Sequence, residues 1–239
     1  MAGSQAMWVV RSSERGGWAP LVDPPGESGT GGSEITAFAS RDGKLTVGLW
    51  SREPDTWSFE RPYDEVALIL EGRAEMDGDD GRTHRLSRGT IVVTPKGATG
   101  AWRISETLTK CFAIYEGGRV GDTTIRSVAA DADTHDWTQI PTEPGDPSEP
   151  GEETVVFRSI DDLVSVGLWR RAPDTGPMDL TDYHEVACLL EGEVEVAPAA
   201  GGEVLSVGPD DVLVTPRGSR AEWRARTAVR KFWVAYHGE

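Results

Sequence analysis

A nine-residue string occurs twice in this chain, and this duplication limits the fold more than any other feature of the sequence. Residues 64–72 read DEVALILEG, and residues 184–192 read HEVACLLEG, 120 positions later. The similarity extends well beyond this string, with offsets between 119 and 121. The matches include Trp50 with Trp169, Thr94-Pro95 with Thr215-Pro216, Trp102 with Trp223, and Lys110 with Lys231. This period far exceeds the roughly 20–50 residues of a solenoid repeat, so it indicates duplication of a whole domain.

The duplication predicts two domains of similar size in a chain of 239 residues. We expect an N-terminal domain over residues 1–120 and a C-terminal domain over residues 121–239, joined by a linker at about 121–150. Each domain is long enough to bury a hydrophobic core of its own.

The net charge argues against several classes of partner. The 40 acidic and 24 basic residues give a formal charge of −16. This charge repels phosphate backbones and anionic membrane surfaces, so we expect no nucleic acid and no membrane as partner. The first six residues lack the apolar core of a signal peptide, and no stretch approaches the roughly 18 apolar residues of a membrane span. Cys111 and Cys188 fall at non-equivalent places in the repeats, which favours reduced thiols in a cytoplasmic protein.

Short runs of alternating polar and apolar residues dominate both halves, and turn-forming residues separate them. The clearest runs in the first half are residues 45–50, 66–70, 90–94 and 111–115. Residues 77–81 and 199–202 are rich in Gly, Asp and Ala and indicate hairpin turns between such runs. Residues 8–10 and 124–127 resemble each other and are expected to form the entering strand of each half. Strands of this length indicate an all-β fold in which each half is an antiparallel, double-sheet barrel.

Two further spacings resemble the sequence motifs of the cupin superfamily. Six residues separate Glu from Gly at Glu65–Gly72 and again at Glu185–Gly192, as the E-x6-G end of the first cupin motif requires. The opening of the second motif is matched by Gly89, Pro95 and Gly97, and by Asp210, Pro216 and Gly218. The chain most resembles the subgroup of ethanolamine-utilisation and ureidoglycine aminohydrolase-like proteins. The resemblance implies a bicupin: two tandem cupin (double-stranded β-helix, jelly-roll) barrels.

The metal ligands of the family are missing from the positions where the resemblance would place them. The two motif histidines would fall at Phe59 and Arg61, or at Ser58 and Glu60, and in the second half at Asp179 and Thr181, or at Met178 and Leu180. The third would fall at Gly100 and Ala221. The four histidines of the chain show no metal-ligand spacing, and transition metals require several N, O or S ligands. We therefore expect neither barrel to hold the usual metal, and no cofactor.

Strand parity then predicts the interior of each barrel. If Glu65 points inward, as the resemblance implies, Phe59, Arg61 and Tyr63 share its face, and Trp102 joins them. The same reasoning places Tyr183, Glu185 and Trp223 in the second barrel, together with Asp179 and Thr181. The first cavity would then balance its carboxylate with a cation, whereas the second would hold two carboxylates and no cation.

These interior residues suggest a metal-independent enzyme that acts on a small organic molecule in the N-terminal barrel. Glu65 would be the general base, with a pKa raised by the apolar barrel wall. Tyr63 would be the acid or oxyanion donor, Arg61 would anchor an anionic group, and Trp102 would stack on a planar one. Such general acid–base chemistry suits an isomerase, cyclase or lyase.

Three alternatives remain open. Arg61 and Glu65 form only a static structural bridge in the first. The second is a non-catalytic small-molecule-binding or accessory cupin. In the third, Asp179 and Glu185 are non-standard ligands of a metal-dependent hydrolase or dioxygenase. The expected partner is a small-molecule substrate or ligand, and we leave a homodimer open.

Overall fold

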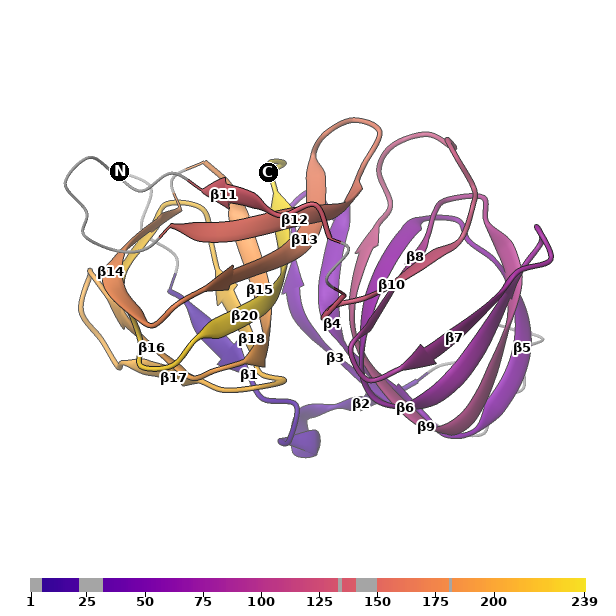
Figure 1. The fold of residues 1–239 in the computed structure, drawn as a ribbon, viewed down its shortest axis with the longest axis horizontal. Coiled ribbons are helices and arrows are strands. Elements are labelled where there is room, and N and C mark those ends of the chain that lie inside the picture. The colour runs from indigo at the N-terminus through magenta and orange to yellow at the C-terminus, as the bar shows by residue number, and fades with distance from the viewer. Residues whose placement is uncertain (1–5, 22–31, 133–134, 141–149, 181) are drawn as a thin grey trace. The chain divides into compact units, whose positions relative to one another are not determined.

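The computed structural model describes residues 6–21, 32–132, 135–140, 150–180 and 182–239, which form almost only β-strands (Figure 1). The chain divides into two compact units. The first barrel comprises residues 14–133 and 159–161, and the second barrel comprises residues 1–13, 134–158 and 162–239. The predicted all-β fold is confirmed. Within the described ranges, no helix is long and apolar enough to cross a membrane.

The first barrel is built from one continuous nine-stranded sheet. Its strands are β2 (Ala19–Pro20), β3 (Gly32–Ala39), β4 (Leu45–Arg52), β5 (Asp55–Glu60), β6 (Asp64–Gly78), β7 (Thr83–Ser87), β8 (Thr90–Thr94), β9 (Thr99–Tyr115) and β10 (Arg126–Ala129), preceded by the 3-10 helix η1 (Arg15–Gly17). Their order is β10-β8-β6-β9-β4-β3-β2, with β5 on β9 and β7 on β6. The long strands β6 and β9 pair along most of their length, and register shifts between Ile69 and Ala74 interrupt the ladder. Such shifts bend a strand, so one sheet can form both walls of a barrel.

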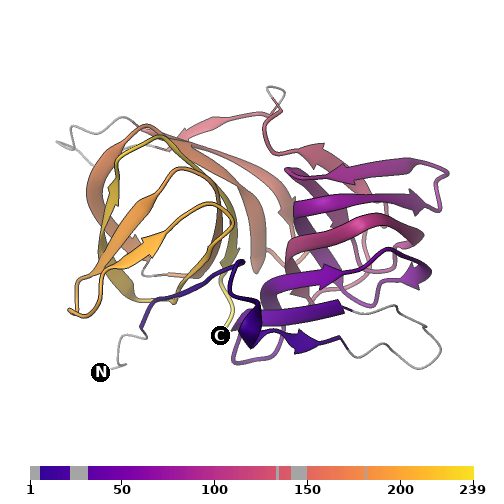
Figure 2. The ribbon, with the colours of Figure 1, turned by 90° about the horizontal axis from the view of Figure 1, so that it is seen from below.

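The second barrel forms its walls from two separate sheets. Its strands are β1 (Trp8–Val10), β11 (Thr138–Ile140), β12 (Gly151–Arg158), β13 (Val164–Arg171), β14 (Asp174–Leu180), β15 (His184–Glu191), β16 (Val194–Pro198), β17 (Leu205–Val207), β18 (Val212–Thr215), β19 (Ser219–Ala225) and β20 (Val229–Tyr236). The sheet orders are β1-β18-β15-β20-β13-β12-β11 and β14-β19-β16-β17. The counterparts of β6 and β9 are each divided into two strands here, after Glu191 and after Ala225. Figure 2 shows these strands curving around a common axis.

Each barrel contains its own hydrophobic cluster, made by the inward-facing residues of its strands. In the first barrel the cluster includes Ile69, Met76, Trp102, Leu108 and Phe112. In the second barrel it includes Leu189, Val196, Leu213, Trp223 and Val229, and Met7 from the chain start. The alternating runs of the sequence therefore give each repeat a separate core.

The motif glycines are explained by backbone conformation. Gly72 and Gly192 have φ of 84° and 86°, in the left-handed region that side chains disfavour. A Cβ at Gly72 would also lie 2.2 Å from the carbonyl oxygen of Thr107. Asp210 takes the place of the motif glycine Gly89, and both have positive φ, 66° and 81°. Aspartate tolerates this conformation better than most residues with a side chain.

The first strands of the two repeats do not stay with the half of the sequence in which they occur. Strand β1 pairs antiparallel with β18, so the chain start belongs to the second barrel (Figure 1). At the equivalent place, β10 pairs with β8 of the first barrel. The structure thus corrects the expected domains of 1–120 and 121–239, because residues 1–13 and 121–133 are exchanged between them. Each exchanged strand covers an edge whose backbone groups would otherwise lack partners.

Deletion of residues 1–13 should therefore destabilise the second barrel and not the first. The deletion uncovers β18 and removes the buried side chain of Met7, at a cost of at least about 2 kcal/mol. Hydrogen–deuterium exchange should show faster exchange in Val212–Thr215. Loss of protection in Thr90–Thr94 of β8 instead would contradict the strand exchange.

Candidate functional sites in the two barrel interiors

The first barrel encloses a cavity of about 420 Å³. Strands β3, β4, β5, β6 and β9 supply most of its lining. Its lining includes aromatic and charged side chains, and the main ones are Trp50, Trp57, Phe59, Arg61, Tyr63, Glu65 and Lys110. The predicted interior residues Phe59, Arg61, Tyr63 and Glu65 therefore do meet in one cavity.

Glu65 lies between two cations in this cavity. Its Oε1 accepts a hydrogen bond from Lys110 Nζ, and its Oε2 lies 3.1 Å from Arg61 Nη2. Arg61 Nη1 also donates to Tyr63 Oη at 3.4 Å. The lysine reaches the carboxylate because Lys110 pairs across the ladder with Ile69, which shares the inward face of β6 with Glu65. Glu65 and Lys110 are only 3% and 6% exposed, so the pair is buried.

The two cations reverse the expected pKa of Glu65. Burial acts to raise this pKa, but Arg61 and Lys110 outweigh burial and lower it from 4.5 to about 2. The expectation of a raised pKa is therefore wrong, and Glu65 is a very weak base. Lys110 is affected as well. Burial and the positive charge of Arg61 lower the pKa of Lys110, and the attraction of Glu65, which acts to raise it, does not offset them. Burial and the charge of Glu65 raise the pKa of Tyr63, which keeps its proton at neutral pH.

Trp102 does not have the predicted role of a substrate platform. Its side chain is 1% exposed and is not part of the cavity lining. Trp57, its cross-strand partner, stacks on it at 5.8 Å between ring centroids and lines the cavity in its place. Lys110 Nζ lies 4.6 Å from the ring centroid of Trp50 and 5.3 Å from that of Trp102, so indole faces surround the ammonium.

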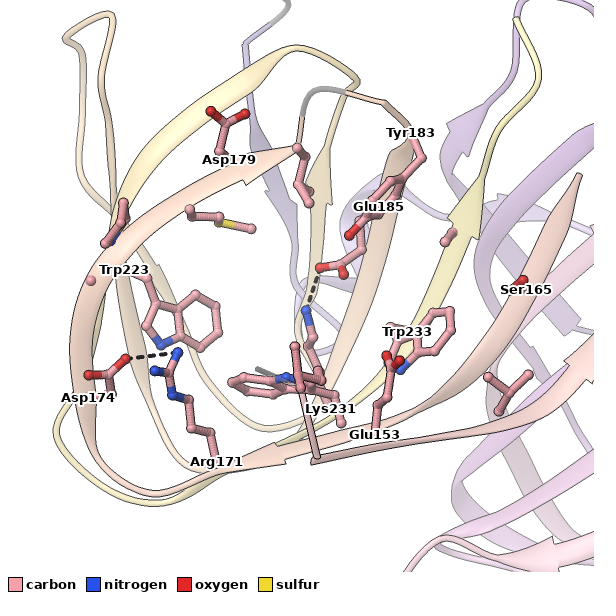
Figure 3. Close-up of a pocket in the computed structure, with 18 of the residues that line it drawn as sticks. Glu153, Ser165, Arg171, Asp174, Asp179, Tyr183, Glu185, Trp223, Lys231 and Trp233 are labelled. Carbon is pink, nitrogen blue, oxygen red and sulfur yellow. Dashed lines mark hydrogen bonds and ion pairs between the residues drawn. The ribbon is translucent and has the colours of Figure 1, made fainter. Parts of the chain in front are cut away.

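The second barrel encloses a cavity of similar volume, about 420 Å³. Tyr183, Glu185 and Trp223 line it, as predicted from strand parity (Figure 3). Glu185 is bonded to Lys231 Nζ at 2.5 Å, and this ammonium lies 5.1 Å from the ring centroid of Trp169. The expectation that this cavity holds no cation is therefore wrong.

The remaining residues predicted for the second interior have other positions. Asp179 is exposed and pairs with Arg220 at 3.0 Å. It lines the cavity mouth without an ion pair to Lys231, and Thr181 lies outside the described residues. Tyr183 differs from Tyr63 in its electrostatic surroundings. Burial, Glu185 and Glu153 all raise the pKa of Tyr183, and no cation acts against them.

Sequence reasoning missed Lys110 and Lys231 as members of the two sites. Each lies on a strand far along the chain from its glutamate, 45 and 46 residues away. The signal that was present is their equivalence in the duplication, since both repeats keep a lysine that is buried in the structure.

The residues present do not fit the metal site that the cupin motifs imply. The family glutamate would be a ligand, but Glu65 and Glu185 are bonded to lysine ammonium groups. A divalent cation at either place would lie beside one or two positive charges, which oppose its binding. A Cβ at Gly100 would lie 2.3 Å from the carbonyl oxygen of Asp77, so a histidine does not fit there. Across the described ranges, no group of three His, Cys, Asp or Glu side chains is placed to hold a metal ion.

Comparison with known proteins identifies the family. Residues 39–112 and 158–233 each match the EutQ-like cupin domain. These segments make up more than half of the chain, which therefore belongs to the EutQ-like cupin family and contains two cupin domains in tandem. No curated protein sequence matches the chain.

Solved structures share the two-barrel architecture at low sequence identity. A protein of unknown function from Pseudomonas syringae pv. tomato has a TM-score of 0.72 and 20% identity, over 96% of this chain and 98% of that one. A putative glyoxylate-induced protein from Pseudomonas aeruginosa has a TM-score of 0.70 and 12% identity, over 99% and 90%. The enzyme HEPD from Streptomyces albus, with 2-hydroxyethylphosphonate and Fe(II) bound, has a TM-score of 0.65 and 11% identity, over 98% of this chain and 76% of that one. At these identities the likeness concerns the fold alone.

Neutralisation of Glu65 should destabilise the first barrel strongly. Glu65→Gln leaves Arg61 and Lys110 buried without their shared carboxylate, which costs about 3–5 kcal/mol. Glu185→Gln is the matched control, because it leaves only Lys231 uncompensated and should cost less. Urea unfolding of both variants measures the difference. Equal losses would show that Arg61 adds nothing to the first site.

Acid should remove the same stabilisation in the native protein. The folded pKa of Glu65, about 2, lies below the ordinary 4.5. Its contribution is therefore complete above about pH 4.5 and is lost as the pH falls towards 2.

Proposed function

We propose that this protein is a metal-independent bicupin whose first barrel binds a small organic anion. The observation that carries this proposal is the buried group of Arg61, Glu65 and Lys110. One carboxylate there faces two cations, so this buried group keeps one formal positive charge. The other carboxylates that line the cavity, Glu34 and Glu60, are exposed. An incoming anion would balance that charge, and the planar fork of an arginine suits a carboxylate or phosphate.

The walls of the first cavity suggest the rest of the ligand. Trp50, Trp57, Phe59 and Tyr63 line it, and Arg61 lies 4.5 Å from the ring centroid of Phe59. Large aromatic surfaces favour a ligand with a planar or apolar body. A volume of about 420 Å³ lies in the usual range of small-molecule sites. An aromatic or unsaturated carboxylate combines these properties.

Metal independence is supported by the chemistry of the cavity. The solved structures of similar fold include an enzyme with Fe(II) bound and an oxalate decarboxylase with Mn(II) centres. In this chain lysine ammonium groups are bonded to both motif glutamates, so positive charge is already present where a metal would bring it. The first cavity therefore offers cationic hydrogen-bond donors for an anion in place of ligands for a metal.

Catalysis in the same cavity is the second candidate, and the surroundings of Tyr63 and Lys110 favour it. The raised pKa of Tyr63 keeps its hydroxyl protonated, and the lowered pKa of Lys110 makes its ammonium a better proton donor. Both groups could stabilise an oxyanion that develops on a bound substrate. Glu65 would hold Lys110 in place and would not act as the base. In an isomerisation or tautomerisation of an activated carboxylate, water would take up the carbon-bound proton while these two donors stabilise the oxyanion.

Anion binding should depend on Arg61. Benzoate titrated into the protein by calorimetry should bind saturably, and neutral benzamide should bind much more weakly. Arg61→Thr should weaken benzoate binding about tenfold or more, since a charge-assisted hydrogen bond is lost. Arg158→Thr is the matched control, because Arg158 is exposed at the second cavity. Loss of binding after treatment with EDTA would contradict metal independence, and equal affinity in Arg61→Thr would contradict the site.

Tyr63→Phe should separate binding from catalysis. The variant loses one hydroxyl and should keep both its melting temperature and its affinity for benzoate. If the cavity is catalytic, the wild-type protein accelerates exchange of the α-protons of 2-oxo acids in D2O, as followed by NMR. The variant should then be slower by about 10²–10⁴-fold. Exchange at the same rate in both proteins would exclude Tyr63 as the donor.

A further inference from the structure

One of the carboxylates that line the second cavity takes part in no ion pair within the described ranges. Four carboxylates and three cations line this cavity. Within the lining, Arg171 pairs with Asp174 and Lys231 with Glu185. Arg158 and Asp179 pair with Asp162 and Arg220, which lie outside the lining. Among the described residues, Glu153 forms no ion pair with any of them. Of the four carboxylates that line this cavity in the described part of the chain, Glu153 is the one without a cation paired with it.

Glu153 is placed by the strand pairing to face the aromatic part of the cavity. It lies on β12, directly across the ladder from Trp169 on β13. Its side chain is partly buried, and Figure 3 shows its carboxyl group directed into the cavity on the side of Trp233. An unbalanced carboxylate in such surroundings is stabilised by a cation that enters the cavity.

Indole rings form the other walls. Trp169, Trp223 and Trp233 line the cavity, and Trp169 and Trp223 meet edge to face at 5.9 Å between ring centroids. The face of an indole attracts ammonium groups, and Lys231 Nζ already lies 5.1 Å from the ring centroid of Trp169. These walls therefore suit an organic cation better than an inorganic one.

The first cavity provides an internal comparison. Glu34 is the counterpart of Glu153, because it lies across the ladder from Trp50 as Glu153 does from Trp169. The first cavity adds Arg61, where the second repeat has the uncharged Thr181. The two tyrosines respond to this difference: Arg61 acts to lower the pKa of Tyr63, whereas Glu185 and Glu153 both raise that of Tyr183.

We propose that the second cavity binds a small organic cation of the amine or quaternary ammonium class, with Glu153 as its counter-ion and the indole rings as its walls. This site is independent of the anion site in the first barrel, because the residues that form it belong to the second barrel. The protein would then carry two cavities of opposite charge preference that arose from one duplicated domain.

The experiment is a titration of the full chain with tetramethylammonium chloride, with uncharged tert-butanol as the isosteric control. Calorimetry should show saturable binding of the cation and none of the alcohol. Glu153→Gln should lower the affinity for tetramethylammonium about tenfold or more. Glu34→Gln, the same change at the equivalent position of the first barrel, should leave its affinity unchanged.

A second measurement does not depend on the folding of any charge variant. In the wild-type protein, NMR should show the indole N–H signals of Trp169, Trp223 and Trp233 shifting with tetramethylammonium, while those of Trp50 and Trp57 stay in place. Absence of saturable binding would overturn the proposal. So would equal loss of affinity in Glu153→Gln and Glu34→Gln, or shifts confined to the first-barrel indoles.

Discussion

A lysine bonded to a buried glutamate is the interaction on which the interior of each barrel depends. Glu65 with Lys110, and Glu185 with Lys231, join neighbouring strands of the same sheet. A buried carboxylate without a partner costs several kcal/mol, and the ammonium offsets this cost. In both barrels the ammonium therefore neutralises the motif glutamate that points inward. The indole ring of Trp50 in the first barrel and that of Trp169 in the second add favourable contacts with the positive charge of the ammonium beside them.

The two cavities show how one duplicated site can diverge through a single charged residue. Both keep a glutamate, a lysine, a tyrosine and a tryptophan at equivalent places. Arg61 is present in the first repeat alone, and it shifts the balance of charge there towards positive. Under the two proposals, this residue is the reason that one cavity accepts an anion and the other a cation. Duplication allows such a division, because each barrel has its own core and changes in one cavity leave the other intact.

Membership of the EutQ-like cupin family accounts for the architecture and does not by itself define the chemistry. The solved structures of similar fold include an enzyme with Fe(II) bound and a protein of unknown function. This chain departs from the cupin metal motifs in a few interior side chains. Function must therefore be argued from these residues, and the charge they leave over is the most informative property of each cavity.

The sequence by itself determined the duplicated all-β architecture and the turn glycines, and its resemblance to cupins indicated that Glu65 and Glu185 point inward. These features follow from local rules, since strand alternation and left-handed turns depend on near neighbours along the chain. The tertiary structure alone decided the partners of the two glutamates, because Lys110 and Lys231 approach them from other strands. It also decided that Trp57 covers Trp102, and that the first strand of each repeat completes the other barrel. The tertiary structure also decided the direction of the Glu65 pKa shift. Burial raises this pKa and the two neighbouring cations lower it, and only the positions of Arg61 and Lys110 show which effect is larger.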